Sequence, residues 1–382
     1  MKLPARGASI DHLMVLRGIA ALGVFLGHFA GIGSLSIGAI VTKGPWNYLP
    51  HDKPFETWRT VVEILTPLVG LNFVILFFAQ SGYLMGKVFF DARYDARSGK
   101  DAFYWARYLR LAPALYVNLV LCALFFKYAD DAPLPMIGDF LFINNFTGRG
   151  INLVTWSLSH EMQYYLVAPF VFLLCHKRPI LLVVLVAATF WLGQMYPPFG
   201  FVFAFLTGFG VNLVPKREIS PAQKQVGLVI GLIVLHLGFN VLYFYHQASE
   251  AVLLAAMTSA ALVWLCEQPS REEHQAPVLR QLMIVGYLTY GFYLWHYPIL
   301  RTFADLFFGW VQALAMPSWL ATLTFHALEL GVVLPLSLGA AYCSFVLIEA
   351  RFRPNLYSPI QRHRRARASG REVGQSIPLS NS

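Results

Sequence analysis

Ten apolar runs, each long enough to cross a bilayer, occupy most of this 382-residue chain. A spanning helix needs about 20 mainly apolar residues. The runs lie at 12–32, 68–90, 109–128, 155–175, 179–197, 199–215, 225–246, 249–267, 282–305 and 320–348. Charged residues make up 13% of the chain, against about 25% in soluble domains. The sequence therefore predicts an all-α polytopic membrane protein with about ten transmembrane helices.

Lysine and arginine are shared unevenly between the loops, and cytoplasmic loops are the ones that collect them. The basic loops and tail are 87–100, 175–179, 215–224, 270–280 and the C-terminal stretch, whereas 130–150, 196–200, 246–250 and 309–318 are poor in basic residues. With ten spans this alternation places both termini in the cytoplasm. The net charge of +9 is thus a topology signal, not a sign of nucleic-acid binding.

One transmembrane domain, residues 12–353, is predicted between a short cytoplasmic segment, 1–11, and a basic cytoplasmic tail, 354–382. The tail is expected to be disordered or to lie on the anionic inner leaflet, and 33–67 to form an outer loop. The first apolar run is too long for a signal peptide, so it is predicted to be retained. The four cysteines form no CxxC pair, and neither a disulfide framework nor a metal site is predicted.

Arg17 and His28 lie within the first span, eleven residues apart. Eleven residues turn a helix through about 1,100°, close to three full turns, so both side chains share one face about 16 Å apart. Ionisable residues in spans are costly and usually face the bundle interior. A long side chain near a helix end can also reach the interface, but the shared face favours a functional pair.

Three further groups of polar residues lie within or at the ends of the predicted spans. Arg107 and Arg110 are neighbours on one helix face and could bind phosphate or carboxylate, or could simply anchor the inner end of the third span. Glu161 is expected near the depth of His28, where a carboxylate would orient the imidazole; alternatively it is an exposed first-turn residue. His296 lies deep in the ninth span among aromatic residues and is a candidate for lining an interior passage.

These stretches together resemble the membrane acyltransferase 3 family of O-acyltransferases. The resemblance rests on six motifs. In the first, LRGIAALGVFLGH, an Arg is followed eleven residues later by a His. The others are FFAQSGYLMG, ARYLRLAP, WSLSHEMQYYL, YGFYLWHYPIL and LIEARFR. They occur in the family's order over nearly the whole chain. His160 stands where the family has an apolar or acidic residue, and this departure could alter acid–base behaviour beside Glu161.

The resemblance implies acyl transfer from cytoplasmic acyl-CoA, most often acetyl-CoA, to a hydroxyl of an acceptor at the outer side of the inner membrane. Acceptors in the family are lipopolysaccharide, exopolysaccharide, nodulation factors and some macrolides; no permanently bound cofactor is implied. The family's functional positions carry over onto Arg17, His28, Arg107, Arg110 and Glu161. The inner arginines would hold the donor phosphates, and His28 would act as general base or carry the acyl group.

Two rival classes fit the span count: a transporter or flippase of a lipid-linked sugar, and a structural subunit of a polysaccharide export complex. No internal repeat or pair of broken helices typical of transporters is visible. The identity of the acceptor, the acyl chain length and the oligomeric state are not predicted.

Overall fold

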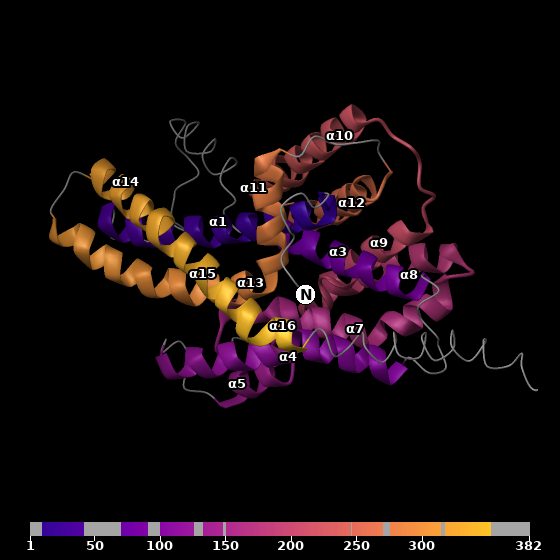
Figure 1. The fold of residues 1–382 in the computed structure, drawn as a ribbon, viewed down its shortest axis with the longest axis horizontal. Helices are drawn as coiled ribbons and strands as arrows, with labels where there is room; N and C mark the ends of the chain where they lie inside the picture. The colour runs from indigo at the N-terminus through magenta and orange to yellow at the C-terminus, as the bar shows by residue number, and fades with distance from the viewer. Residues whose placement is uncertain are drawn as a thin grey trace, which may run out of the picture.

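The computed structural model describes residues 10–41, 70–90, 100–125, 133–147, 150–245, 247–269, 276–314 and 318–352. All regular structure in these ranges is helical (Figure 1). Residues 1–9 of the predicted N-terminal segment, most of the predicted outer loop and the predicted tail at 354–382 lie outside the described residues.

A helical segment occupies each of the ten predicted ranges. The segments are α1 (His12–Val41), α3 (Leu71–Phe90), α4 (Lys100–Phe125), α7 (Trp156–Cys175), α8 (Pro179–Met195), α9 with η4 (Val202–Leu213), α10–η5–α11 (Pro221–Phe244), α12 (Ala248–Cys266), α13 (Pro277–Ala313) and α14–η6–α15–η7–α16 (Ser318–Phe352). Six of them are long and apolar enough to cross a membrane. Polar residues make α7 and α13 less apolar than these six. Two further apolar segments, α8 and the combined α9 and η4, are shorter than these six. The count of ten crossings stays a prediction.

Two glycines bring α1 and α13 into close contact. A Cβ atom on Gly18 would collide with the backbone carbonyl of Leu282, and one on Gly286 with the carbonyl of Met14. Small residues at such crossings let helix backbones approach closely in membranes. Ten residues further along each helix, His28 meets His296, so the two helices run parallel and in register. Figure 1 shows the indigo α1 and the orange α13 extending side by side.

Contacts between other helices fix their relative directions. Ser81 and Phe89 of α3 meet Glu161 and Phe172 of α7 in the same order along both chains, so α3 and α7 are parallel. The α4 and α13 helices are parallel by the same argument, through Tyr290 to Leu111 and Asn118 to Leu294. Each parallel pair joins two odd-numbered or two even-numbered predicted spans, as an alternating topology requires.

The predicted cytoplasmic helix ends gather at one end of the bundle. Glu267 follows α12 and accepts hydrogen bonds from Lys87 at 3.0 Å and Lys216 at 3.3 Å. Burial opposes ionisation of this carboxyl, but hydrogen bonds from Tyr83 and the two lysines hold its pKa below the usual range. One carboxylate thus links the ends of three segments that lead into basic loops: α3, α9 with η4, and α12.

The predicted outer connections meet at the other end. Asn145 donates to the carbonyl of Pro198 at 3.1 Å, which links the connection after α4 to the turn between α8 and α9. Ser249, at the start of α12, donates to Gln194 near the end of α8. Basic-rich and basic-poor connections are therefore separated along the bundle.

Buried polar groups fold the segment between α4 and α7 into the bundle. Within it lie the short helices α5 (Pro133–Phe140), α6 (Asn144–Thr147) and η2 (Leu153–Thr155). The carboxylate of Asp139 accepts from the Ile151 amide and the Thr155 hydroxyl, each at 2.5 Å, and from Asn144 at 2.6 Å. Ile151 and Val154 are buried, so α7 begins inside the bundle and not at its outer surface.

Candidate active site

A small cavity at the centre of the bundle brings together three of the residues predicted from the sequence. Arg17 of α1, Arg110 of α4 and Glu161 of α7 all line it, and its volume is about 40 Å³. Aromatic side chains complete the wall, among them Phe77, over whose ring the Arg17 guanidinium lies at 6.0 Å. Two positive charges and one carboxylate therefore share one small, largely apolar space.

Glu161 is held by two hydroxyl groups. Ser81 of α3 donates to its Oε1 atom at 2.9 Å, and Tyr165, one turn further along α7, donates to the same oxygen. The sequence did not predict either hydrogen-bond partner of Glu161, although Ser81 lies within the FFAQSGYLMG motif. The i,i+4 spacing of Glu161 and Tyr165 was a signal that could have found the second.

Arg107 and Arg110 do not lie together as a single phosphate clamp. Arg110 lines the central cavity, whereas Arg107 lines a separate hollow between α4 and α7. The ring of Tyr165 lies 5.8 Å from the Arg107 guanidinium, and its hydroxyl donates to Glu161, which lines the central cavity. The two cations therefore serve two adjoining spaces on either side of Tyr165.

His28 and His296 form a hydrogen-bonded pair. The Nδ1 atom of His28 lies 3.0 Å from Nε2 of His296, and the Nδ1 atom of His296 lies 3.1 Å from the carbonyl oxygen of Phe292. A carbonyl oxygen only accepts, so Nδ1 of His296 carries the hydrogen. Nε2 of neutral His296 is then an acceptor, and Nδ1–H of His28 donates to it. The Nε2 atom of His28 is left with its lone pair.

Tyr293 connects the histidine pair to the central cavity. Its ring lines the cavity and lies 5.7 Å from the ring of His296. Its hydroxyl is 2.6 Å from the hydroxyl of Ser157 and donates to the carbonyl of Val154 at 3.0 Å. The histidines thus lie beyond the cavity, on the side of the predicted outer connections.

A pair of buried asparagines supports the helix at His296. Pro298 has no backbone N–H, so it cannot donate to the carbonyl of Leu294 one turn earlier. Asn118 donates to that carbonyl at 3.1 Å and Asn152 at 3.0 Å. Asn152 also donates to the side-chain oxygen of Asn118 at 2.9 Å. The carbonyl that Pro298 leaves unbonded is therefore satisfied by two other elements.

The expected pairing of Glu161 with His28 is wrong. Glu161 lies in the cavity with Arg17, and Arg17 is about 16 Å from His28 along α1. The partner of His28 is His296. The reason is that α7 begins inside the bundle, after the buried residues Ile151 and Val154, so Glu161 lies deeper than its place near the helix start indicates.

His160, the departure from the family pattern, does not enter the cavity. Its Nδ1 atom lies 2.9 Å from the carbonyl of Trp156 in the preceding turn, and its ring packs against Phe78 and Phe201. It is a packing residue between α3, α7 and α9.

Comparison with known proteins adds a family to this geometry. A family model described as an acyltransferase domain matches residues 9–347. The chain is also 26% identical over 281 residues to the peptidoglycan O-acetyltransferase OatA of Listeria monocytogenes, a match that covers 60% of this chain and 45% of that protein. The chain therefore matches less than half the length of this relative. No solved structure matches the chain. Because the family model covers the chain from before α1 into η7, the protein belongs to the acyltransferase 3 family.

Proposed function

We propose that the protein is an integral inner-membrane O-acyltransferase that moves an acetyl group from cytoplasmic acetyl-CoA to a hydroxyl of a glycan acceptor at the outer face. The observation that carries this proposal is the pairing of His28 with His296. It leaves one imidazole nitrogen with an available lone pair, beyond the cavity that Arg17 and Arg110 line.

The proposed topology has both termini in the cytoplasm and ten crossings. The parallel pairs α1 with α13, α3 with α7 and α4 with α13 support it, as does the separation of basic and basic-poor connections. In this orientation Arg17 lies in the inner half of α1 and His28 in the outer half. Donor and acceptor would then approach His28 from opposite sides.

The reaction at His28 would begin with its Nε2 lone pair. As general base, Nε2 takes the proton of the acceptor hydroxyl while that oxygen attacks the thioester carbonyl; the C–S bond breaks and the thiolate leaves, receiving the proton. As acyl carrier, Nε2 itself attacks the thioester carbonyl, the C–S bond breaks and the CoA thiolate leaves. The acceptor hydroxyl then attacks the acetyl-imidazole, the N–C bond breaks and returns the lone pair to Nε2, and the hydroxyl proton goes to the thiolate. Both routes use the same atom, and in both His296 orients the ring through Nδ1–H.

The charged residues of the cavity would bind the donor. Arg17 and Arg110 supply charge-assisted hydrogen bonds for phosphate or carbonyl oxygens. Glu161, fixed by Ser81 and Tyr165, balances those cations while the donor is absent. An uncompensated cation in so apolar a space would otherwise be costly.

The acceptor is proposed as a glycan because the relative is named for O-acetylation of peptidoglycan, a glycan polymer. Peptidoglycan, lipopolysaccharide, exopolysaccharide and glycolipid hydroxyls are the acceptors to compare; a macrolide is the alternative small-molecule acceptor.

Transfer of label in a defined membrane tests the proposal. The purified protein is placed in nanodiscs and incubated with acetyl-labelled acetyl-CoA and each glycan in turn. The enzyme is expected to give labelled glycan that mild base releases as acetate. Exchange of label between acetyl-CoA and free CoA without acceptor would assign the carrier route. No transfer to any acceptor, together with sugar-lipid translocation in proteoliposomes, would support a flippase instead.

A further inference from the structure

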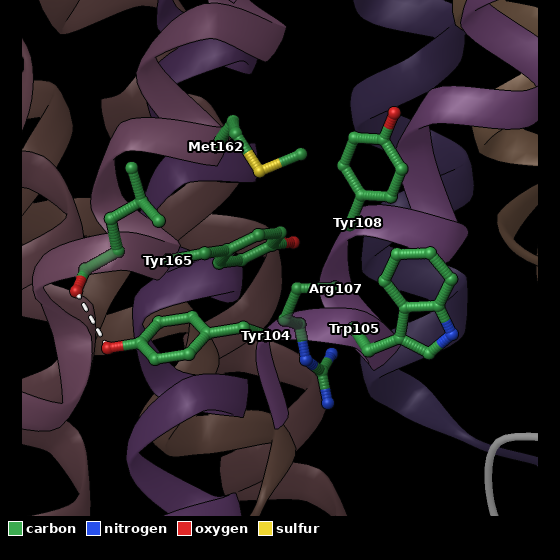
Figure 2. A pocket seen from close by; sticks show the side chains of 7 residues that line it. Tyr104, Trp105, Arg107, Tyr108, Met162 and Tyr165 are labelled. Atoms are coloured by element: carbon green, nitrogen blue, oxygen red, sulfur yellow. Dashed lines mark hydrogen bonds between the residues drawn. The ribbon is translucent and has the colours of Figure 1, made fainter. Parts of the chain in front are cut away.

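A second hollow lies beside the central cavity, between the first turns of α4 and the middle of α7. Its volume is about 490 Å³, and its walls are Tyr104, Trp105, Arg107, Tyr108, Met162, Tyr165 and Leu166. Figure 2 shows Trp105 and Tyr108 on one side and Met162, Tyr165 and Tyr104 on the other, with Arg107 below. We name this hollow the aromatic slot.

The rings of the aromatic slot are held in place by their own contacts. Trp105 and Tyr108 stack with centroids 5.7 Å apart and planes 20° apart. Tyr104 donates to the carbonyl of Leu166 at 3.2 Å (Figure 2), and Tyr165 donates to Glu161. Trp105 nevertheless keeps 58% of its surface exposed, so among the described residues one wall of the slot presents a largely uncovered aromatic ring.

Charge distinguishes the slot from an ordinary lipid-facing groove. The buried Arg107 lines it, and Arg110, one turn further along α4, lines the central cavity. A planar aromatic wall next to two guanidiniums matches a nucleotide, in which a flat base is joined to phosphates. An acyl chain would gain nothing from the arginines.

We propose that the aromatic slot binds the nucleobase of the acyl donor, with Trp105 as the stacking surface; this inference rests on the proposed function. The slot, Arg107, Arg110, the central cavity and the His28–His296 pair follow one another from the basic end of the bundle toward the other end. The base, phosphates, flexible arm and thioester of a CoA donor follow one another in the same order. Tyr165, which lines the slot and bonds to Glu161 of the cavity, is the side chain between the two spaces.

The test compares two donors and two tryptophan variants. The donors are acetyl-CoA and S-acetyl-4′-phosphopantetheine, which has the same thioester and arm but no nucleotide. The variants are Trp105→Ala and, as matched control, Trp310→Ala on α13, because Trp310 is also 58% exposed and lies outside the slot. Losing a stacked base should raise the KM for acetyl-CoA about tenfold in Trp105→Ala, with kcat retained. Trp310→Ala should keep the wild-type KM.

The shortened donor separates the possible outcomes. With S-acetyl-4′-phosphopantetheine, the wild type and Trp105→Ala should have the same KM. An equal rise in KM for both donors, or no rise for acetyl-CoA, would overturn the inference, and the second result would fit a groove for a lipid chain.

A binding measurement keeps the inference separate from the proposed activity. Adenosine 3′,5′-bisphosphate, which carries the base and no thioester, should quench tryptophan fluorescence of the wild type and of Trp310→Ala but much less that of Trp105→Ala. If no donor is turned over while this quenching is seen, the proposed transferase function fails and the nucleotide site stands. If donors are turned over and quenching does not depend on Trp105, the nucleotide site fails alone.

Discussion

The Nδ1 atom of His28 lies 3.0 Å from Nε2 of His296, two residues separated by 268 positions in the chain. The glycines that bring their helices together, Gly18 and Gly286, are separated by the same number of positions. The pair is therefore set by the register of two parallel helices: a close backbone contact near one end aligns the imidazoles ten residues further on.

Replacing His296 should lower kcat and leave the KM for acetyl-CoA unchanged, because His296 is proposed to orient His28 and not to bind the donor. His296→Leu removes the acceptor for Nδ1–H of His28 and should cost about tenfold or more in kcat. His296→Gln keeps an oxygen that can accept this hydrogen bond and should recover part of the loss. Equal activity in the two variants would rule out the orienting role.

The asparagines at Leu294 should matter more while Pro298 is present. Asn152→Leu leaves the Leu294 carbonyl with one donor fewer and should cost about 1 kcal/mol of unfolding free energy. Pro298→Ala supplies a backbone N–H for this carbonyl, so Asn152→Leu should cost less in that background. Thermal unfolding of the four proteins of this double-mutant cycle measures the difference. A cost of Asn152→Leu that is the same in both backgrounds would show that the two residues are not coupled.

Gly18→Ala should weaken both the fold and the activity. The added Cβ would meet the Leu282 carbonyl, a backbone group that cannot rotate away, and overpacking of this kind costs about 1–3 kcal/mol. The shift between α1 and α13 should also separate the histidines and lower kcat. Gly339→Ala is the matched control, since within the described residues no atom outside its own helix backbone lies within 4 Å of its added Cβ; it should keep full activity and gain up to about 1 kcal/mol.

Glu161→Gln should lower the KM for acetyl-CoA, because the proposed role of Glu161 is to balance Arg17 and Arg110 while the anionic donor is absent. Glutamine keeps an oxygen for Ser81 and Tyr165 but removes the negative charge beside Arg17 and Arg110. Ser81→Ala, which removes one hydrogen bond and no charge, should have the smaller effect, about 1 kcal/mol. Rates measured with varied acetyl-CoA for both variants test this order, and a raised KM in Glu161→Gln would argue against the charge-balancing role.

The helix ranges and the helix face shared by Arg17 and His28 could be predicted from the sequence, because both are local properties. Apolar runs of bilayer length located the ten helical segments, and helical periodicity placed Arg17 and His28 on the same face of α1. The partners of these residues could not be found in this way. Ser81 lies 80 positions from Glu161, and Asn152 lies 142 positions from Leu294. The predicted depth of Glu161, near that of His28, is wrong because buried residues precede α7. Hydropathy does not indicate that a helix begins inside the bundle.

The most direct measurement is the rate of acetyl transfer by His28→Ala in nanodiscs, alongside the wild type and His176→Ala. His176 lies at the end of α7 and bonds to the Phe172 carbonyl, so its loss should leave the rate unchanged. His28→Ala with an unchanged midpoint of thermal unfolding should be slower by at least about 100-fold. A folded His28→Ala protein that transfers acetyl at the wild-type rate would mean that the reaction does not use this histidine.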